Sequence, residues 1–411
     1  MKLSFISFGG PAGQIAIMQT ELVDKRRWIT QPRFLHALNF CMLLPGPEAQ
    51  QLAIYIGWLL HGTRGGIVAG VFFVLPSVCI LLALSFVYAA YGNIPWIAAI
   101  FYELKPVVMA IVGAAVVRIA RKSLTDRLAW VVAAAGFVSI FFYKVPFPII
   151  IFAAAFAGWI RGLLSPGGRT HSASASPARA EADFVVGAPG QRALRNGMAC
   201  AVLWWLPVFI AGALQGWNGT LFKQGVFFSK AAVVTFGGAY AVLPYVAQQA
   251  VENYNWLGTG QMLDGLGLAE TTPGPLIMVL QFVGFMGGWN HPGALTPLLA
   301  ASIGALLTTW VTFVPWFLWI LVGAPCVERL HENVALRSAL STVTAAVVGV
   351  ILNLAVWFGL SVIFPTAGTI DWLAVMLGIA TFVGLVKWKW DVLSVVTGGG
   401  LCGLLLHFLR G

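Results

Sequence analysis

The chain has 411 residues, of which 59% are hydrophobic and only 9% are charged. A typical soluble domain carries about a quarter charged residues, so this composition excludes a water-soluble fold. The net charge is +10, but the basic residues are scattered among short loops, which excludes a basic face for nucleic acid. The five cysteines include no CxxC pair, so neither a disulfide framework nor a zinc site is indicated. We therefore predict an all-α polytopic membrane protein in contact with lipid.

Apolar runs long enough to cross a hydrocarbon core of about 30 Å recur along the whole chain. They predict thirteen transmembrane segments, at residues 3–23, 34–60, 65–91, 94–119, 128–143, 145–163, 197–217, 226–251, 259–288, 293–324, 336–363, 370–386 and 391–410. The 17 tryptophans lie mostly near the ends of these runs, where an aromatic belt would contact headgroups. The first two segments contain helix breakers, which leaves open that they re-enter the membrane instead of crossing it.

The stretch at 164–196 is polar and rich in Ser, Ala, Pro and Gly, which predicts a flexible cytoplasmic linker. It separates an N-terminal repeat at 1–163 from a connecting transmembrane helix at 197–217 and a C-terminal repeat at 218–411. If every segment crosses once, Lys and Arg are more numerous on the side of the N-terminus. The positive-inside rule then predicts a multi-pass protein of the cell inner membrane with a cytoplasmic N-terminus. The basic loop at 25–33 falls on the other side and is the exception.

Two related halves are visible when the chain is shifted by 228 residues, which places Lys2 on Lys230. The same shift aligns Phe8-Gly9-Gly10 with Phe236-Gly237-Gly238, Trp28 with Trp256, and Pro45-Gly46-Pro47 with Pro273-Gly274-Pro275. Seven predicted crossings separate the two starts, and an odd number turns the second half upside down. The sequence therefore predicts two inverted-topology repeats, a common plan of secondary transporters that places the binding site at the repeat interface.

The Gly and Pro interruptions lie within apolar segments at matching places in both halves. Pro removes a backbone donor and Gly permits unusual backbone angles, so the helices are expected to break there. A break in lipid is tolerated only where protein or a wet cavity receives the freed polar groups. The free N–H groups of a helix that starts at a break suit an anion, and a tetrahedral oxyanion needs several such donors. The alternative interpretation is close helix packing, because Gly9-x-x-x-Gly13 and Gly284-x-x-x-Gly288 fit the small-residue pattern.

The candidate substrate-binding residues are the interruptions together with nearby donors and cations. The set consists of Lys2, Phe8, Gly9, Gly10, Pro45, Gly46, Pro47, Gln50, Lys230, Phe236, Gly237, Gly238, Pro273, Gly274 and Pro275. Each lysine precedes the Phe of its motif by about 9 Å along a helix axis, and a buried dianion needs such positive charge. Both lysines are also compatible with snorkelling to headgroups.

Intramembrane acids are rare, and each is a candidate functional group. Glu48 directly follows the first Pro-Gly-Pro and Glu270 lies just before the second, so both are candidate coupling residues. An ionised carboxylate repels a neighbouring anion and protonation relieves the repulsion, which couples proton and anion movement. The alternative is that each carboxylate forms a hydrogen bond that closes broken backbone. Asp264 is expected close to a segment end and solvated, whereas Glu103 and Lys105 fall on different helix faces.

Enzyme signatures are missing from the sequence. No Walker loop, G-x-S-x-G elbow or Rossmann fingerprint is present, and the six histidines do not cluster. We therefore expect no metal, no cofactor and no enzymatic activity. The energy source is expected to be the proton gradient or the membrane potential.

Three stretches resemble the chromate ion transporter family in its long-chain, two-domain form: Phe5–Gln14, Leu43–Gln50 and Leu268–Pro275. The resemblance covers nearly the whole chain. It implies two fused inverted halves that export chromate across the cytoplasmic membrane as a secondary active transporter and confer chromate resistance. The partners then include chromate, sulfate and protons, and a homo-oligomer is compatible with the sequence.

Three other functions remain open at this point. A permease or exchanger for sulfate or another oxyanion would share every feature above, since sulfate is a similar tetrahedral dianion. An anion channel would show flux without coupling. A membrane-embedded chromate reductase is disfavoured, because the sequence has no cofactor motif and no clustered cysteines.

Overall fold

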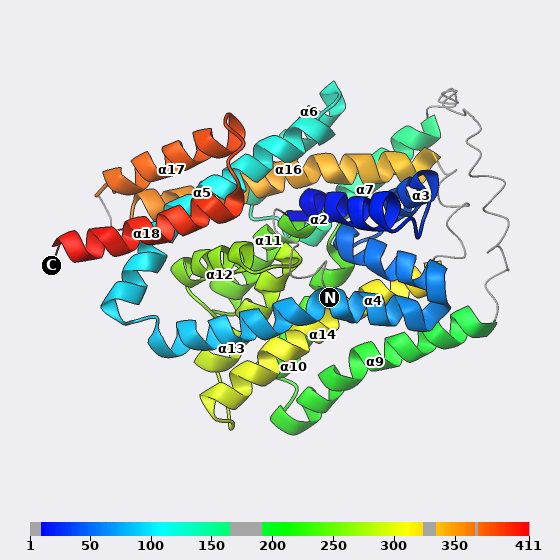
Figure 1. Ribbon diagram of the computed structural model, residues 1–411, viewed down its shortest axis with the longest axis horizontal. Helices are drawn as coiled ribbons and strands as arrows, with labels where there is room; N and C mark the ends of the chain where they lie inside the picture. The colour runs from blue at the N-terminus through cyan, green and yellow to red at the C-terminus, as the bar shows by residue number, and fades with distance from the viewer. Residues whose placement is uncertain (1–9, 165–190, 324–333, 366–368, 411) are drawn as a thin grey trace.

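The computed structural model describes residues 10–164, 191–323, 334–365 and 369–410, and every regular element in these ranges is a helix (Figure 1). In chain order the elements are α2 (Gly10–Gln19), η1 (Thr20–Lys25), α3 (Gln31–Cys41), α4 (Glu48–Tyr91), α5 (Pro95–Ser123), α6 (Arg127–Phe141), α7 (Phe147–Leu164), α9 (Gln191–Gln215), α10 (Thr220–Val234), α11 (Ala239–Ala247), η3 (Gln248–Asn253), α12 (Thr259–Thr271), η4 (Leu276–Met278), α13 (Val279–Asn290), α14 (Pro297–Gly323), α16 (Val334–Ile363), α17 (Trp372–Val386) and α18 (Val392–Arg410). The all-α class expected from the sequence is therefore confirmed for the described part of the chain.

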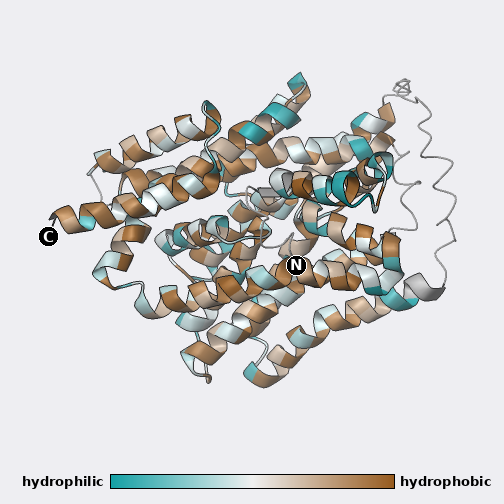
Figure 2. Ribbon diagram, in the orientation of Figure 1, coloured by the Kyte–Doolittle hydropathy of each residue, from teal (hydrophilic) through white to brown (hydrophobic). Residues whose placement is uncertain are grey.

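Seven of the described helices are long and apolar enough to cross a membrane, namely α4, α5, α7, α9, α14, α16 and α18. Three shorter apolar helical stretches accompany them, at α6, at α17 and at 276–290. Figure 2 shows apolar residues along the long helices and hydrophilic residues gathered around α3 and the helix ends. This distribution is typical of a polytopic membrane protein, whereas the count of thirteen crossings stays a prediction.

The chain leaves the helical conformation at both Pro-Gly-Pro sequences, Pro45–Pro47 and Pro273–Pro275. Gly46 and Gly274 have φ angles of 131° and 126°, a region that residues with a side chain rarely adopt. The prolines lack an N–H and cannot continue a helix. The segment expected at 259–288 is therefore three elements, α12, η4 and α13, and not one helix.

The second Phe-Gly-Gly sequence separates α10 from α11. Gly237 and Gly238 have φ angles of 81° and 90°, which only glycine adopts at little cost. α11 therefore starts afresh at Ala239 and has an N-terminus of its own inside the protein. The segment expected at 226–251 is divided at this point.

α4 consists of two helices that meet at a kink at His61 and Gly62. Gly62 has φ 64° and ψ −158°, and a Cβ there would meet nothing within 4 Å. Gly62 therefore serves backbone conformation, whereas Gly57 and Gly65 let the two parts of α4 pack closely, since a Cβ on either would lie within 2.5 Å of the other's carbonyl oxygen. The segment expected at 34–60 is shared between α3 and the first part of α4, and the segment expected at 65–91 is the second part.

Two groups of helices build the core. α16 packs against α5, α6, α7 and α11, and α14 packs against α4, α9, α10 and α13. A Cβ at Gly349 of α16 would lie 1.9 Å from the carbonyl oxygen of Ala133 in α6, and one at Gly284 of α13 would lie 2.7 Å from that of Gly304 in α14. Gly284 therefore serves close helix packing, which is the alternative interpretation of its sequence pattern.

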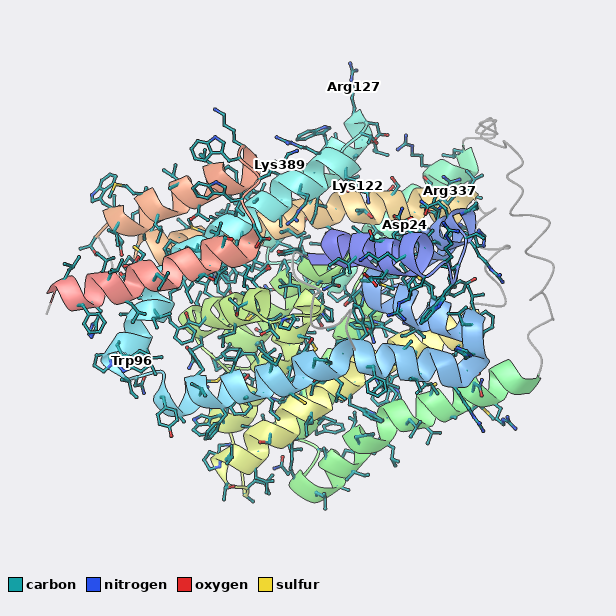
Figure 3. All side chains as sticks on the ribbon, viewed as in Figure 1. Asp24, Trp96, Lys122, Arg127, Arg337 and Lys389 are labelled. Atoms are coloured by element: carbon teal, nitrogen blue, oxygen red, sulfur yellow. The ribbon has the colours of Figure 1, made fainter. Side chains whose placement is uncertain are left out.

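Figure 3 places Asp24 and Arg337 toward one end of the long axis and Trp96 toward the other. The basic loop at 25–33 directly follows Asp24 and so lies at the end of Arg337. α3, with 11 residues, is too short to cross a bilayer on its own. The linker expected at 164–196 falls largely outside the described residues, and α9 covers most of the connecting helix expected after it.

Candidate functional site

The interruptions of the two halves of the chain contact each other crosswise. The N–H of Gly46 donates a hydrogen bond of 2.7 Å to the carbonyl of Thr235, which directly precedes Phe236. In the opposite sense, Gln14 of α2 donates a hydrogen bond of 2.6 Å from Nε2 to the carbonyl of Gly274. Polar backbone groups freed by the breaks therefore find partners in the other half.

Two side chains cover the glycines of the Pro-Gly-Pro turns. Ser77 of α4 donates a hydrogen bond of 2.5 Å to the carbonyl of Pro273, and a Cβ at Gly274 would lie 1.8 Å from its Oγ. Trp316 of α14 is fully buried, and a Cβ at Gly46 would lie 2.8 Å from its Cδ1. Both turns therefore require glycine for space as well as for backbone conformation.

Glu48 lies where two helix N-termini meet. It occupies the first turn of α4, and both of its carboxylate oxygens lie 3.7 Å from the position of a Cβ on Gly238, the N-cap of α11. The free N–H groups and the dipole of a helix N-terminus attract negative charge. The side chain is half-buried. The Glu48 carboxylate thus occupies the kind of place in which an oxyanion binds.

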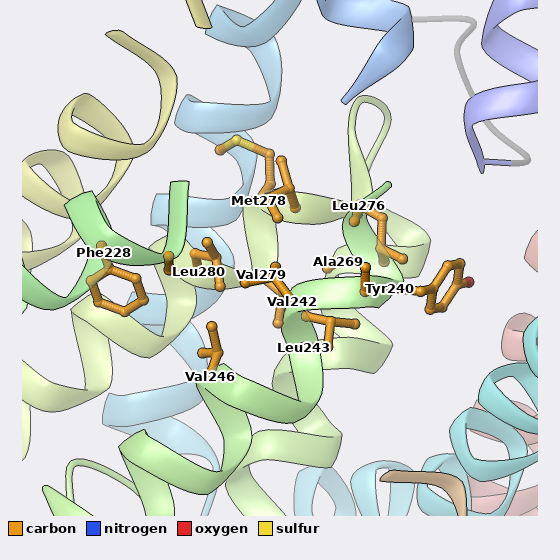
Figure 4. Packing of buried hydrophobic residues seen from close by; sticks show 14 of the residues in the cluster. Phe228, Tyr240, Val242, Leu243, Val246, Ala269, Leu276, Met278, Val279 and Leu280 are labelled. Atoms are coloured by element: carbon orange, nitrogen blue, oxygen red, sulfur yellow. The ribbon is translucent and has the colours of Figure 1, made fainter. Parts of the chain in front are cut away.

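The other candidate carboxylate, Glu270, lies in the last turn of α12 and is also half-buried. Tyr240, the second residue of α11, donates a hydrogen bond of 2.5 Å to its Oε1. Figure 4 shows the Tyr240 side chain pointing away from the apolar side chains of Val242 and Leu243, with the hydroxyl at its far end. The start of α11 therefore presents an apolar face to the core and a hydroxyl to Glu270.

Two cations of α5 face these two carboxylates. Arg118 interacts with the Tyr240 hydroxyl and with Glu270, and Lys122 interacts with Glu48. Arg118 and Lys122 are four residues apart, so they lie on one face of the helix. Both side chains remain exposed, which leaves their charge available to a ligand.

The charges of this site balance in a way that suits a divalent anion. The ionised carboxylates of Glu48 and Glu270 offset the positive charges of Arg118 and Lys122. With both carboxyls protonated or displaced, two positive charges and two helix N-termini remain, which match the charge of a dianion. Among the described residues no group of three His, Cys, Asp or Glu side chains could hold a metal ion. The site therefore acts through charge and hydrogen bonds.

Gln50 and Gln51 lie in the first turns of α4, and both are fully buried. Gln51 donates a hydrogen bond of 2.7 Å from Nε2 to the carbonyl of Pro45 and so fastens the turn. Neither amide atom of Gln50 has a hydrogen-bond partner in the described part of the chain. A buried amide without a partner is costly, so Gln50 is a candidate donor to a ligand or to water.

The remaining candidates from the sequence are placed as follows. Lys2, Phe8 and Gly9 lie outside the described residues, and Gly10 is the first residue of α2. Lys230 is exposed on α10 and forms no ion pair with another described residue. The cations that the structure brings to Glu48 and Glu270 are Lys122 and Arg118 instead.

The expectation that Asp264 is solvated was wrong. Its side chain is 5% exposed, and the hydroxyl of Tyr88 donates a hydrogen bond of 2.8 Å to its Oδ2. The physical reason is that α4 and α5 pack against α12 and cover this residue, although it lies only five residues after the start of the helix.

Sequence reasoning missed Arg118, Lys122 and Tyr240 as site residues. Arg118 and Lys122 were counted only as loop charges at the end of an apolar segment. A basic pair spaced by four residues on one helix face was the available signal. Tyr240 carried a weaker signal, since its hydroxyl follows the Phe-Gly-Gly sequence by two residues within an otherwise apolar stretch.

Comparison with known proteins gives consistent results. The family model described as Chromate transporter matches residues 1–159 and 222–404. A chromate transport protein of Pseudomonas aeruginosa is 33% identical over 424 residues, which cover 100% of this chain and 92% of that protein. A chromate transport protein of Cupriavidus metallidurans is 28% identical over 410 residues, which cover 99% of this chain and 91% of that protein. An uncharacterised transporter of Bacillus subtilis is 28% identical over 141 residues, which are 34% of this chain and 71% of that protein. No solved structure matches the chain.

Proposed function

This chain belongs to the chromate transporter family, and we propose that it exports chromate across the cytoplasmic membrane as a secondary active transporter. Such export would confer chromate resistance. Two relatives that match the chain over nearly its whole length are named chromate transport proteins. The observation that carries the proposal is the convergence of Lys122 and the starts of α4 and α11 on Glu48.

The proposed architecture is a pair of inverted-topology repeats, 1–163 and 218–411, joined by the linker and α9. The family model matches two separate stretches of the chain, each about the size of one repeat. The Bacillus subtilis relative also aligns over a length close to one repeat. The crosswise hydrogen bonds between the breaks add to this support.

The proposed substrate site lies between the starts of α4 and α11. The free N–H groups of both first turns donate to the oxyanion, and Arg118 and Lys122 offset its charge. The Gln50 amide supplies a neutral donor without a competing partner. Gly237 and Gly238, where a Cβ would meet no atom closer than 3.7 Å, allow the backbone to approach the anion closely.

The proposed coupling uses Glu48 and Glu270. When ionised, each carboxylate attracts a cation of α5 electrostatically, and so competes with the substrate. Protonation or outward rotation of the carboxylates frees Lys122 and Arg118 for the dianion. A proton and an anion therefore favour different states of the same site, which is the condition for coupled movement.

The basic end of the molecule sets the proposed orientation. Arg337 and the loop that follows Asp24 lie at one end (Figure 3), and Arg121 and Lys122 form the last turn of α5. The positive-inside rule assigns this basic end to the cytoplasm. Exposed Arg118 and Lys122 are then reached from the cytoplasmic side, which is the side from which an exporter takes its substrate.

The test is chromate uptake by energised everted vesicles that contain the protein, with and without excess sulfate. Accumulation that sulfate competes away supports an oxyanion exporter with a shared site. Sulfate flux without chromate movement would contradict the proposal and favour a sulfate permease. Chromate flux that only follows its gradient, without accumulation, would favour an anion channel.

A matched pair of variants tests the site itself. Lys122→Gln and Arg121→Gln remove the same charge from adjacent exposed positions of α5, but only Lys122 interacts with Glu48. Loss of a charge-assisted hydrogen bond of about 1.5–3 kcal/mol should raise the KM for chromate about 10- to 100-fold in Lys122→Gln alone. Equal KM values in the two variants would remove Lys122 from the site.

A further inference from the structure

A second buried acid lies outside the site described above. Asp264 of α12 is 5% exposed. The hydroxyl of Tyr88, from α4, donates a hydrogen bond of 2.8 Å to its Oδ2, and Lys105, from α5, acts on it electrostatically. Its other oxygen, Oδ1, is buried and has no hydrogen-bond partner among the described residues. Three elements therefore enclose one carboxyl and leave one of its oxygens free.

The Lys105 ammonium lies one turn of α12 before Asp264. A Cβ at Gly260 would be 3.3 Å from its Nζ, and residues 260 and 264 share a helix face. The same Nζ lies 5.7 Å from the centre of the Tyr102 ring. The Lys105 ammonium therefore lies near both the first turn of α12 and the Tyr102 ring.

Tyr102 connects this buried group with open space. Two cavities, of about 430 Å³ and about 390 Å³, are both lined by Tyr102 and Glu103. The Tyr102 hydroxyl donates a hydrogen bond of 2.6 Å to Asp371, which lines the larger cavity. These cavities bring open space to Tyr102 and Glu103, which lie on the same turn of α5 as Lys105.

Other titratable groups lie on the helices that pack against α12. α5 and α18 both pack against α12. Glu103 of α5 interacts with Cys402 of α18, and His407 of α18 lines the smaller cavity. The groups that face Asp264 are Tyr88 and Lys105.

We propose that Asp264, Tyr88 and Lys105 form a proton-binding site, separate from the anion site, whose occupancy drives transport. The proposal rests on the proposed function, because it takes the chain to be a coupled transporter. A proton from cavity water bonds to Oδ1, which converts the carboxylate to a carboxyl, and Lys105 keeps its own proton throughout. Along α5 the Lys105 and Arg118 positions are about 20 Å apart, which separates this site from the anion site.

A proton fits this site better than a metal cation. Ca²⁺ or Mg²⁺ takes about six or more oxygen ligands, whereas Asp264 and Tyr88 offer three oxygens, one of which is a hydroxyl that already donates. The Lys105 ammonium would also repel a metal ion. An ionised Asp264 is held by Lys105 and Tyr88, and a neutral one avoids the cost of a buried charge, so both protonation states have support.

α12 can transmit this change to the anion site. It carries Asp264 and Glu270 on one short helix, about 9 Å apart along its axis. Gly258 lies before the helix and Gly274 lies after it, in a non-helical turn. When Asp264 is neutral, the charge that ties α12 to Lys105 of α5 is lost. The helix is then free to shift as a unit and to move Glu270 relative to Tyr240.

The first experiment compares two transport assays in proteoliposomes. Asp264→Asn should lower accumulation of chromate driven by a pH gradient at least about tenfold, while chromate–chromate counterflow, which needs no net proton movement, stays within about threefold of wild type. Asp391→Asn, which removes an exposed acid before α18, is the control and should leave both assays unchanged. Unchanged gradient-driven accumulation in Asp264→Asn overturns the proposal. An equal loss in both assays also overturns it, because a structural role would lower both.

The second experiment observes the proton directly and does not depend on chromate. Infrared spectra of the purified protein in lipid, recorded across a pH series, should contain a protonated-carboxyl band that Asp264→Asn removes and Asp391→Asn keeps. Tyr88→Phe, which preserves the ring, should shift the pH midpoint of this band by about one to two units, because a hydrogen bond to a charged group is worth about 1.5–3 kcal/mol. A band that survives in Asp264→Asn, or a midpoint unchanged in Tyr88→Phe, overturns the proton site. Normal infrared results without any chromate flux would instead reject the proposed function.

Discussion

Replacing Gly274 with alanine should destabilise the protein through two separable costs. Gly274 has φ 126°, and a side chain in this region costs about 1–3 kcal/mol. The new Cβ would also lie 1.8 Å from Oγ and 3.0 Å from Cβ of Ser77, and overpacking of this kind costs about 1–3 kcal/mol more. The free energy of unfolding should therefore fall by about 2–6 kcal/mol.

The substitution Ser77→Gly separates the two costs. Alone, it loses the hydrogen bond to the Pro273 carbonyl and adds a glycine to α4, for about 1.5–2.5 kcal/mol together. In the double variant the overpacking is gone, so the combined loss should be about 1–3 kcal/mol less than the sum of the single losses. Gly293→Ala is the matched control, because Gly293 has φ 62° and a Cβ there meets nothing within 4 Å. It measures the backbone cost without a clash.

The assay is unfolding by sodium dodecyl sulfate in mixed micelles, followed by circular dichroism, for wild type, the two single variants, the double variant and the control. If Ser77 clashes with the new Cβ, the coupling energy of this double-mutant cycle should lie well above its experimental error. If the single losses add to within about 0.5 kcal/mol, Ser77 does not cover Gly274. The crosswise packing of the Pro-Gly-Pro turns would then be wrong.

Three further predictions use the same preparations. Gln50→Leu should lower chromate transport but leave the free energy of unfolding unchanged or increase it, because the Gln50 amide has no described partner. Gln51→Leu should lower the free energy of unfolding by about 1–3 kcal/mol, because it breaks a hydrogen bond. Equal stability losses in the two variants would contradict the assignment. A backbone N–H of α6 and the Arg161 guanidinium hold the pKa of Asp126 below its ordinary value. This contribution is full above the ordinary pKa of an aspartate and disappears as the pH falls through the lowered pKa, so Asp126→Asn should lower the thermal midpoint at pH 7 and progressively less as the solution is acidified; a difference that does not shrink in acid refutes it. Trp316→Ala should cost about 3–5 kcal/mol by leaving a cavity over the first Pro-Gly-Pro turn, and the dodecyl sulfate titration measures it.

The breaks in the helices could be predicted from the sequence because their cause is local. Pro and Gly determine backbone geometry at their own positions, so Pro45–Pro47 and Pro273–Pro275 interrupt helices whatever surrounds them. The same holds for the Gly237 and Gly238 pair. The end of α3 and the start of α4 are thus consequences of a few residues.

The cations of the site could not be predicted in this way. Arg118 and Lys122 meet Glu270 and Glu48 only because α5 packs beside elements that are far away in the chain. The position of Asp264 near a segment end also led to a wrong prediction of its exposure, because α4 and α5 bury it. Contacts between distant segments decide both cases, and a single sequence does not encode them in any local pattern.

The bond from Gln14 to the carbonyl of Gly274 has a consequence for biosynthesis. The two residues are 260 positions apart, an interval that a ribosome translates in about 13–50 s at about 5–20 residues per second. Throughout that time the amide of Gln14 lacks its partner, although the surrounding apolar segments are already leaving the ribosome. A nascent chain that stalls before Gly274 therefore presents an unfinished break to the membrane proteases that remove defective translation products.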